Sequence, residues 1–156
     1  MDKSMLKGIA FGLTSGTITT LGLIVGLHSG TRSAEVVIGG ILVIAIADAL
    51  SDALGIHISE ESDNQSDRSV WTATGATFLS KLVFALTFLV PMLVFELNMA
   101  IIVSIAWGLL MISVFSYYIA KNRKERAVHV IGEHLFIAIL VIVATHFVGD
   151  MVSLLF

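Results

Sequence analysis

Residues 36–54, VVIGGILVIAIADALSDAL, place two carboxylates inside an otherwise apolar run. A helix needs about 20 residues to cross a hydrocarbon core of about 30 Å, so this run forms most of one membrane crossing. Asp48 and Asp52 lie one helical turn apart and therefore share a face. Each acid at this depth costs a few kcal/mol on insertion scales, so such residues normally face a cavity or a partner and mark an ion or proton path.

The composition of the whole chain favours a membrane protein. Of its 156 residues, 56% are hydrophobic and 13% are charged, whereas soluble domains have about 25% charged residues; the mean hydropathy is +0.95. The absence of cysteine excludes disulfide scaffolds, thiolate metal sites and iron–sulfur clusters. Nine Lys and Arg residues provide no basic surface for phosphates, so we expect no nucleic-acid partner.

Four other stretches resemble residues 36–54 in length and hydrophobicity. We therefore predict an all-α integral membrane protein, one domain with five transmembrane helices at about 8–28, 36–59, 70–95, 97–120 and 127–155. The short polar links leave no room for a soluble domain. Residues 1–28 also allow a cleaved signal peptide, which their length, their glycines and the lack of a small-residue cleavage site disfavour.

The basic residues predict the orientation. Seven lie on the side of the N-terminus and one, Arg32, lies on the opposite side; the seven are Lys3, Lys7, Arg68, Lys121, Arg123, Lys124 and Arg126. The positive-inside rule then puts the N-terminus in the cytoplasm and the C-terminus outside. Because no targeting extension precedes the first span, we expect a multi-pass protein of a prokaryotic cell membrane.

Glycines recur every four residues along the first span. They are Gly8, Gly12 and Gly16, and then Gly22, Gly26 and Gly30. Small residues at this spacing let two helix backbones approach closely in lipid. We predict that this face packs a homodimer. The hydroxyls of the same span, such as Ser15, either bond to carbonyls of their own helix or line a polar path.

Further polar side chains follow the acids of the second span. Ser51 and Ser59 continue close to the same stripe, and His57, Glu60 and Glu61 can meet on one face. Carboxylate with imidazole suits Fe(II), Mn(II) or Zn(II) better than Ca(II). We therefore predict metal ligation by Asp48, Asp52, His57, Glu60 and Glu61, and a transport path that includes Ser15, Ser51 and Ser59.

The last span carries two more polar groups. Glu133 and His134 follow His129 near the predicted cytoplasmic end, where they would complete a vestibule that collects cations; a solvated rim is the alternative. His146 and Asp150 form an i, i+4 pair near the outer end, either an exit site or an interfacial anchor.

Lys81 provides an alternative role for the intramembrane acids. It lies inside the third span, where it either neutralises an Asp as a structural pair or extends its ammonium towards the interface. No nucleophile–base pattern, phosphate-binding loop or HExxH motif occurs, so we expect no enzyme. An aspartyl dyad is disfavoured because both acids lie on one helix.

Two motifs resemble the vacuolar iron transporter family, which includes the nodulin-21-like proteins. They are residues 12–20, GLTSGTITT, followed by Gly26, and residues 47–59, ADALSDALGIHIS. Residues 77–80 running to Pro91, and residues 144–146 followed by Gly149, resemble the family more loosely. The likeness covers nearly the whole chain.

The resemblance implies a five-helix homodimer with its ion path near the subunit interface, exporting Fe(II) or Mn(II) from the cytoplasm in exchange for protons. Iron-transporting members carry Asp at the position of Ser15, often an acid at Ile44, and Met at the position of Asp52. The link between the second and third spans is too short for the family's cytoplasmic metal-binding domain.

Together these observations predict a proton-coupled transporter of Fe(II) or Mn(II), with metal ions, protons, lipid and a second copy as partners and no cofactor. The alternative is a membrane scaffold or metal-sensing subunit that does not transport, in which the Asp residues pair with Lys81.

Overall fold

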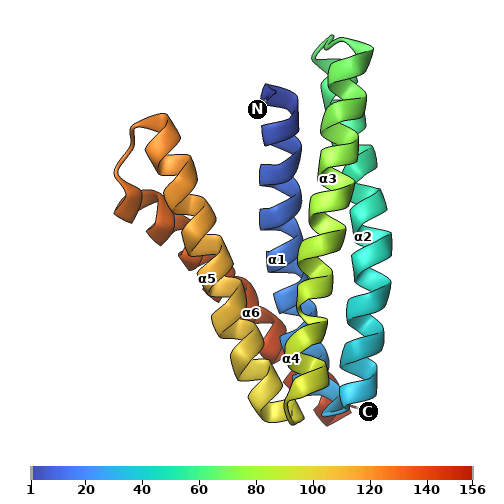
Figure 1. Cartoon of the computed structure of the whole chain (residues 1–156). Helices are drawn as coiled ribbons and strands as arrows, with labels where there is room; N and C mark the ends of the chain where they lie inside the picture. Colours follow the sequence, from blue (N-terminus) through green and yellow to red (C-terminus); the bar gives the residue numbers. More distant parts are fainter. Residues whose placement is uncertain (1, 156) are drawn as a thin grey trace. The chain divides into compact units, whose positions relative to one another are not determined.

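The computed structural model describes residues 2–155, which fold into helices without any strand. The helices are α1 Lys3–Thr31, α2 Ala34–Ser62, α3 Asp67–Thr87, α4 Leu89–Val94, α5 Leu97–Arg123 and α6 Ala127–Leu155 (Figure 1). Counting α3 and α4 together as Asp67–Val94, five helical segments of this range are long and apolar enough to cross a membrane. The prediction of an all-helical chain with five helices long and apolar enough to span a membrane is confirmed.

The third predicted helix, 70–95, is interrupted. α3 ends at Thr87, Phe88 caps it, and α4 begins at Leu89. Pro91 explains the break, because its ring clashes with the carbonyl of the residue four positions earlier, which is Thr87. The helix predicted at 127–155 has these limits in the structure, and the other three extend by up to five residues at their polar ends, where hydropathy is a poor guide to helix limits.

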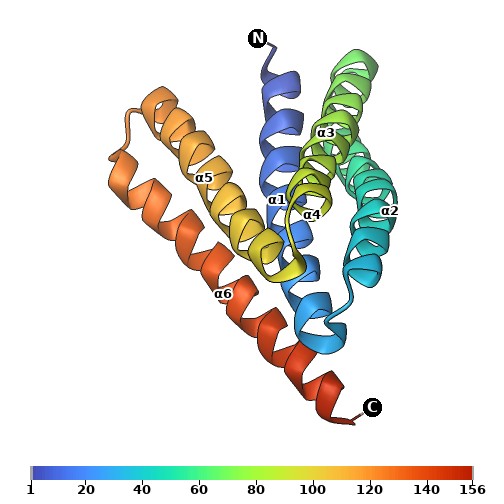
Figure 2. The ribbon, with the colours of Figure 1, turned by 60° about the horizontal axis from the view of Figure 1, so that its bottom comes forward.

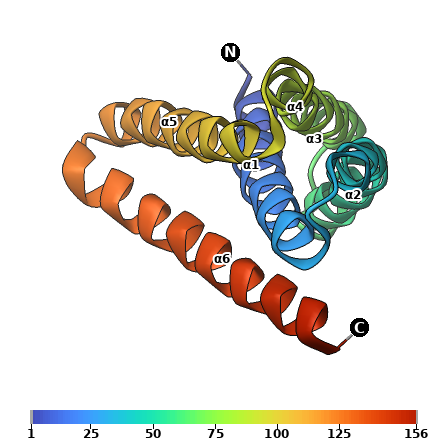
Figure 3. The same ribbon diagram turned by 90° about the horizontal axis from the view of Figure 1, so that it is seen from below.

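The chain divides into two compact units. The first comprises residues 2–20 and 41–88, in which the N-terminal part of α1, most of α2 and α3 lie side by side (Figures 1 and 3). Small residues make this packing close. Ala45, Ala49 and Ala73 are completely buried, and Gly8, Gly12 and Gly16 of α1 lie against α3.

The second unit comprises residues 21–40 and 89–155, in which α5 and α6 form an antiparallel pair (Figure 2). Lys124 ends α5 in the left-handed conformation, with φ of 57°, a common way for helices to end. The C-terminal part of α1 packs on α6: an added Cβ at Gly149 would lie 2.3 Å from the carbonyl oxygen of Gly26.

The glycines of α1 lie against other helices of the same chain in each unit, while the homodimer stays a prediction. A Cβ at Gly8 would lie 2.4 Å from the Ala73 oxygen, and one at Gly12 would lie 2.6 Å from the Thr77 oxygen. Gly22 and Gly26 face Thr145 of α6 in the second unit. The principle of close helix approach applies, but the partners are helices of the same chain.

Large apolar side chains remain exposed along the helices. Val43 of α2 is 68% exposed and Leu93 of α4 is 72% exposed. Lipid is a favourable environment for such surfaces, because tails are as apolar as the side chains.

Candidate ion-binding site

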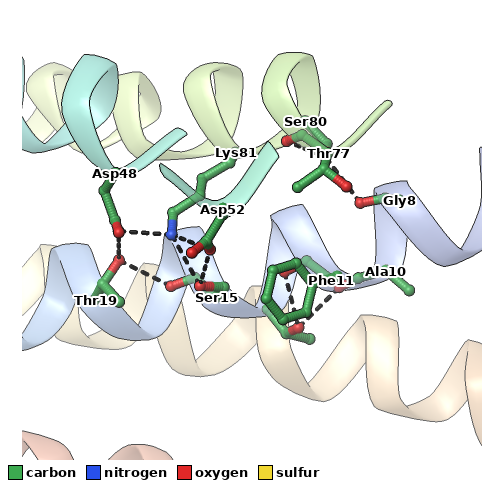
Figure 4. A network of polar contacts seen from close by, with 11 residues as sticks. Gly8, Ala10, Phe11, Ser15, Thr19, Asp48, Asp52, Thr77, Ser80 and Lys81 are labelled. Carbon is green, nitrogen blue, oxygen red and sulfur yellow. Dashed lines mark hydrogen bonds and ion pairs between the residues drawn. The ribbon is translucent and has the colours of Figure 1, made fainter. Parts of the chain in front are cut away.

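Lys81 lies at the centre of a polar cluster in the first unit (Figure 4). Its Nζ lies 2.6 Å from Asp48 Oδ2 and also contacts Asp52 Oδ2. The ammonium donates to the Ser15 hydroxyl at 2.9 Å. Three helices thus contribute to the cluster: α1, α2 and α3.

Hydroxyls of α1 hold both carboxylates. The Ser15 hydroxyl donates to Asp52 Oδ2 at 2.6 Å. The Thr19 hydroxyl lies 2.8 Å from Asp48 Oδ2 and 2.9 Å from the Ser15 carbonyl oxygen. Because these residues lie one turn apart on α1, they match the one-turn spacing of the two acids on α2. The hydroxyls of α1 and the carboxylates of α2 are therefore in register.

The glycines of α1 bring Lys81 into this position. A Cβ at Gly16 would lie 3.0 Å from Lys81 Cγ, and one at Gly12 would lie 3.0 Å from the Lys81 backbone nitrogen. The aliphatic stem of the lysine consequently passes over bare helix backbone. Its side chain is only 1% exposed, although a lysine is rarely buried.

The charges of the cluster do not balance. Two carboxylates face one ammonium, so with all three groups ionised the cluster carries one excess negative charge. The side chains of Asp48 and Asp52 are 25% and 20% exposed, whereas Lys81 is enclosed. The ammonium therefore offsets only one of the two carboxylate charges, and the side chains of both acids remain partly accessible.

Two residues of the predicted path lie outside this cluster. Ser51 and Ser59 are exposed on α2, and neither is a partner of Lys81. Ser15 is the hydroxyl of the predicted path that joins the acids.

The predicted metal ligands at the end of α2 separate into two pairs. Glu60 turns inward and pairs with Lys7 of α1, with only 4% of its side chain exposed. His57 instead contacts Glu61, its Nε2 lying 3.4 Å from Oε1. The Nδ1 of His57 lies 3.0 Å from the Thr74 hydroxyl. His57 and Glu60 therefore have separate partners.

The remaining predicted ligands belong to the second unit. Glu133 lies 3.2 Å from His129, and both are exposed. His134 Nδ1 lies 2.7 Å from the Ser116 hydroxyl of α5. Nowhere between residues 2 and 155 do three His, Asp or Glu side chains form a group that could hold a metal ion. Within the second unit, Glu133 and His134 therefore have separate partners, and a vestibule that joins them to the acids of α2 stays a prediction.

Sequence reasoning left Thr19 out of the site and gave Lys81 only an alternative role. The i, i+4 spacing of Thr19 with Ser15 was the available signal, since it repeats the spacing of the acids. The hydroxyls of α1 divide between roles: Thr14 bonds to the carbonyl of Ala10, whereas the buried hydroxyls of Thr17 and Thr20 lack a hydrogen-bond partner in the described structure.

No protein-family model, curated protein or solved structure matches this chain.

Proposed function

We propose that the protein transports a divalent transition-metal cation, Fe(II) or Mn(II), out of the cytoplasm in exchange for protons, with Asp48 and Asp52 as the ion-binding carboxylates. The observation that carries the proposal is the unbalanced charge around Lys81, where two acids within the apolar span share one ammonium. Intramembrane acids of this kind generally mark ion or proton paths.

Exchange follows from competition for the same oxygens. The ammonium of Lys81 lies among Asp48 Oδ2, Asp52 Oδ2 and the Ser15 hydroxyl, which are the kinds of oxygen that a hard or borderline cation takes as ligands. A metal ion bound by the two carboxylates displaces protons or the ammonium from them. Alternating exposure of such a site to the two sides couples the two gradients.

The test is flux into proteoliposomes, with Mn(II), Fe(II), Zn(II) and Ca(II) supplied separately and internal pH recorded at the same time. We expect Fe(II) or Mn(II) flux with an opposing proton signal, and loss of both signals in Asp48→Asn and Asp52→Asn. Asp67→Asn is the matched control, because Asp67 lies in the first turn of α3, outside the cluster. Undiminished exchange in Asp52→Asn would contradict the assignment.

A second candidate is a scaffold or metal-sensing subunit in which the cluster is structural. The observation in its favour is that both carboxylates and the ammonium have hydrogen-bond or ion-pair partners within the first unit. In this case Asp48→Asn unfolds the protein, whereas a transporter keeps its fold and loses only flux. Size-exclusion chromatography of the variant in detergent distinguishes the two outcomes.

A further inference from the structure

A separate polar pocket of about 570 Å³ lies in the second unit, at the C-terminal part of α1, the start of α5 and the last turns of α6. The residues that concern its chemistry are His28, Ser29, Arg32, Glu96, His146 and Asp150. Ser29 is 6% exposed, while the side chains of His146 and Asp150 are 52% and 48% exposed. The pocket therefore has a buried hydroxyl behind two accessible side chains.

The single proton of the Ser29 hydroxyl determines how the neutral imidazole is oriented. Ser29 donates to Asp150 Oδ1, because an ionised carboxylate only accepts. Ser29 Oγ also lies 3.0 Å from His146 Nδ1. Since the hydroxyl proton is already engaged, Nδ1 must carry a proton and donate it to Ser29. The lone pair of the neutral ring is then on Nε2.

The nitrogen that carries this lone pair lies close to the other oxygen of the same carboxylate. His146 Nε2 lies 3.4 Å from Asp150 Oδ2, so two electron-pair donors lie close together, and a cation near both would offset their repulsion. Two ligands on one zinc ion, with bonds of about 2.0 to 2.1 Å and a tetrahedral angle, are separated by about 3.4 Å. The pair thus has the spacing of two corners of a tetrahedral site.

We propose that His146 Nε2 and Asp150 Oδ2 bind a divalent transition-metal cation, with Ser29 as the positioning residue and water completing the coordination. Ligating histidines commonly donate their other ring N–H to an oxygen, as His146 does to Ser29. The charges of the pocket agree: Glu96 and Asp150 exceed Arg32 by one negative charge while the imidazoles are neutral. This proposal does not depend on the proposed transport function, because it predicts only that the metal ion binds at equilibrium.

The same helix contains a matched control. His129 and Glu133 of α6 have the same i, i+4 spacing, 3.2 Å apart, and are 75% and 60% exposed. Within residues 2–155, however, no hydroxyl fixes the His129 ring as Ser29 fixes His146. If the i, i+4 spacing alone were sufficient for a metal site, both His–carboxylate pairs would bind the metal ion with equal affinity.

The test is isothermal titration calorimetry, in which Zn(II) is added to the purified full chain in detergent. We expect His146→Gln and Asp150→Asn each to remove one class of Zn(II)-binding site. Ser29→Ala should weaken the Zn(II) affinity of this site about tenfold. His129→Gln should leave that affinity unchanged. Ser29→Ala should also keep the melting temperature measured without metal, which separates positioning from a loss of packing. Equal binding by His146→Gln and the wild type overturns the proposal.

A measurement without mutation provides a second check. Zn(II) should protect His146 from diethyl pyrocarbonate more than it protects His129, as read by mass spectrometry of peptides from the wild-type protein. Equal protection of the two histidines, or none, overturns the proposal. Neither result depends on flux through the Asp48 and Asp52 site.

Discussion

Lys81 determines the character of the candidate site. The Lys81 side chain is only 1% exposed, so Asp48, Asp52 and Ser15 together replace the water contacts that its ammonium has lost. The same arrangement makes the carboxylates depend on the lysine. Removing one member of such a buried group is more disruptive than replacing all of it, because the remaining charges lose their partner.

Lys81→Met should therefore lower the free energy of unfolding by about 3 to 5 kcal/mol. The measurement is denaturant or thermal unfolding of the purified protein in detergent. Lys121→Met is the control, because Lys121 is exposed in the last turn of α5 and such changes usually stay within about 0.5 kcal/mol. Combining Lys81→Met with Asp52→Asn should recover part of the loss; equal stability of Lys81→Met and Lys121→Met would refute this account.

Glu60 and Glu61 are neighbours with opposite environments. The side chain of Glu60 is 4% exposed and bonds to Lys7, whereas that of Glu61 is 61% exposed. We expect Glu60→Ala to destabilise the protein by about 1 to 3 kcal/mol through the loss of a buried charge-assisted hydrogen bond. Glu61→Ala should change stability by about 0.5 kcal/mol or less. Similar unfolding midpoints for the two variants would show that the inward turn of Glu60 contributes nothing.

At the scale of helices, α1 uses glycines against two different partners. Gly8, Gly12 and Gly16 meet α3 in the first unit, while Gly26 and Gly30 meet α6 around Gly149 in the second unit. Such contacts between backbones cannot be relieved by a change of side-chain rotamer. Each partner helix is therefore fixed closely to α1 within its own unit.

Gly149→Ala should destabilise the contact between α1 and α6 by about 1 to 3 kcal/mol. The added methyl group would lie 2.3 Å from the Gly26 oxygen and 2.7 Å from Ser29 Cβ, so the helices must separate. Gly132→Ala on the same helix is the control, because its added Cβ meets no atom within 4 Å and alanine favours a helix by about 1 kcal/mol. Unfolding in detergent compares them; a loss in Gly132→Ala as large as in Gly149→Ala would contradict the packing argument.

At the scale of the molecule, the five helical spans have an exposed apolar surface that suits lipid. The distribution of Lys and Arg then predicts which connections share a side of the membrane. The link at residues 63–66 and the α5–α6 turn should lie with the N-terminus, and the turn at Ser33 should lie opposite.

This orientation can be tested directly, because the chain contains no cysteine. Gln65→Cys and Asn122→Cys should react with a membrane-impermeant maleimide from the cytoplasmic side only, and Ser33→Cys from the outer side only. Intact cells and inverted vesicles provide the two measurements. Labelling of Gln65→Cys and Ser33→Cys from the same side would contradict the predicted topology.

Hydropathy and composition were enough to predict a helical membrane protein and to single out its second helix. Long apolar runs can satisfy their backbone in lipid only as helices, so hydropathy alone predicted the five spans. An acid inside such a run is costly, so Asp48 and Asp52 stood out without any knowledge of the fold.

The partner of each side chain could be read only from the way the helices pack. Spacing along one helix shows that the α1 glycines share a face, but not whether that face meets another chain or, as found, α3 and α6. In the same way, Lys81 lies 29 residues from Asp52 and reaches it because α3 packs on bare glycine backbone. Local periodicity describes one helix at a time, whereas contacts between helices depend on how complementary surfaces pack in three dimensions.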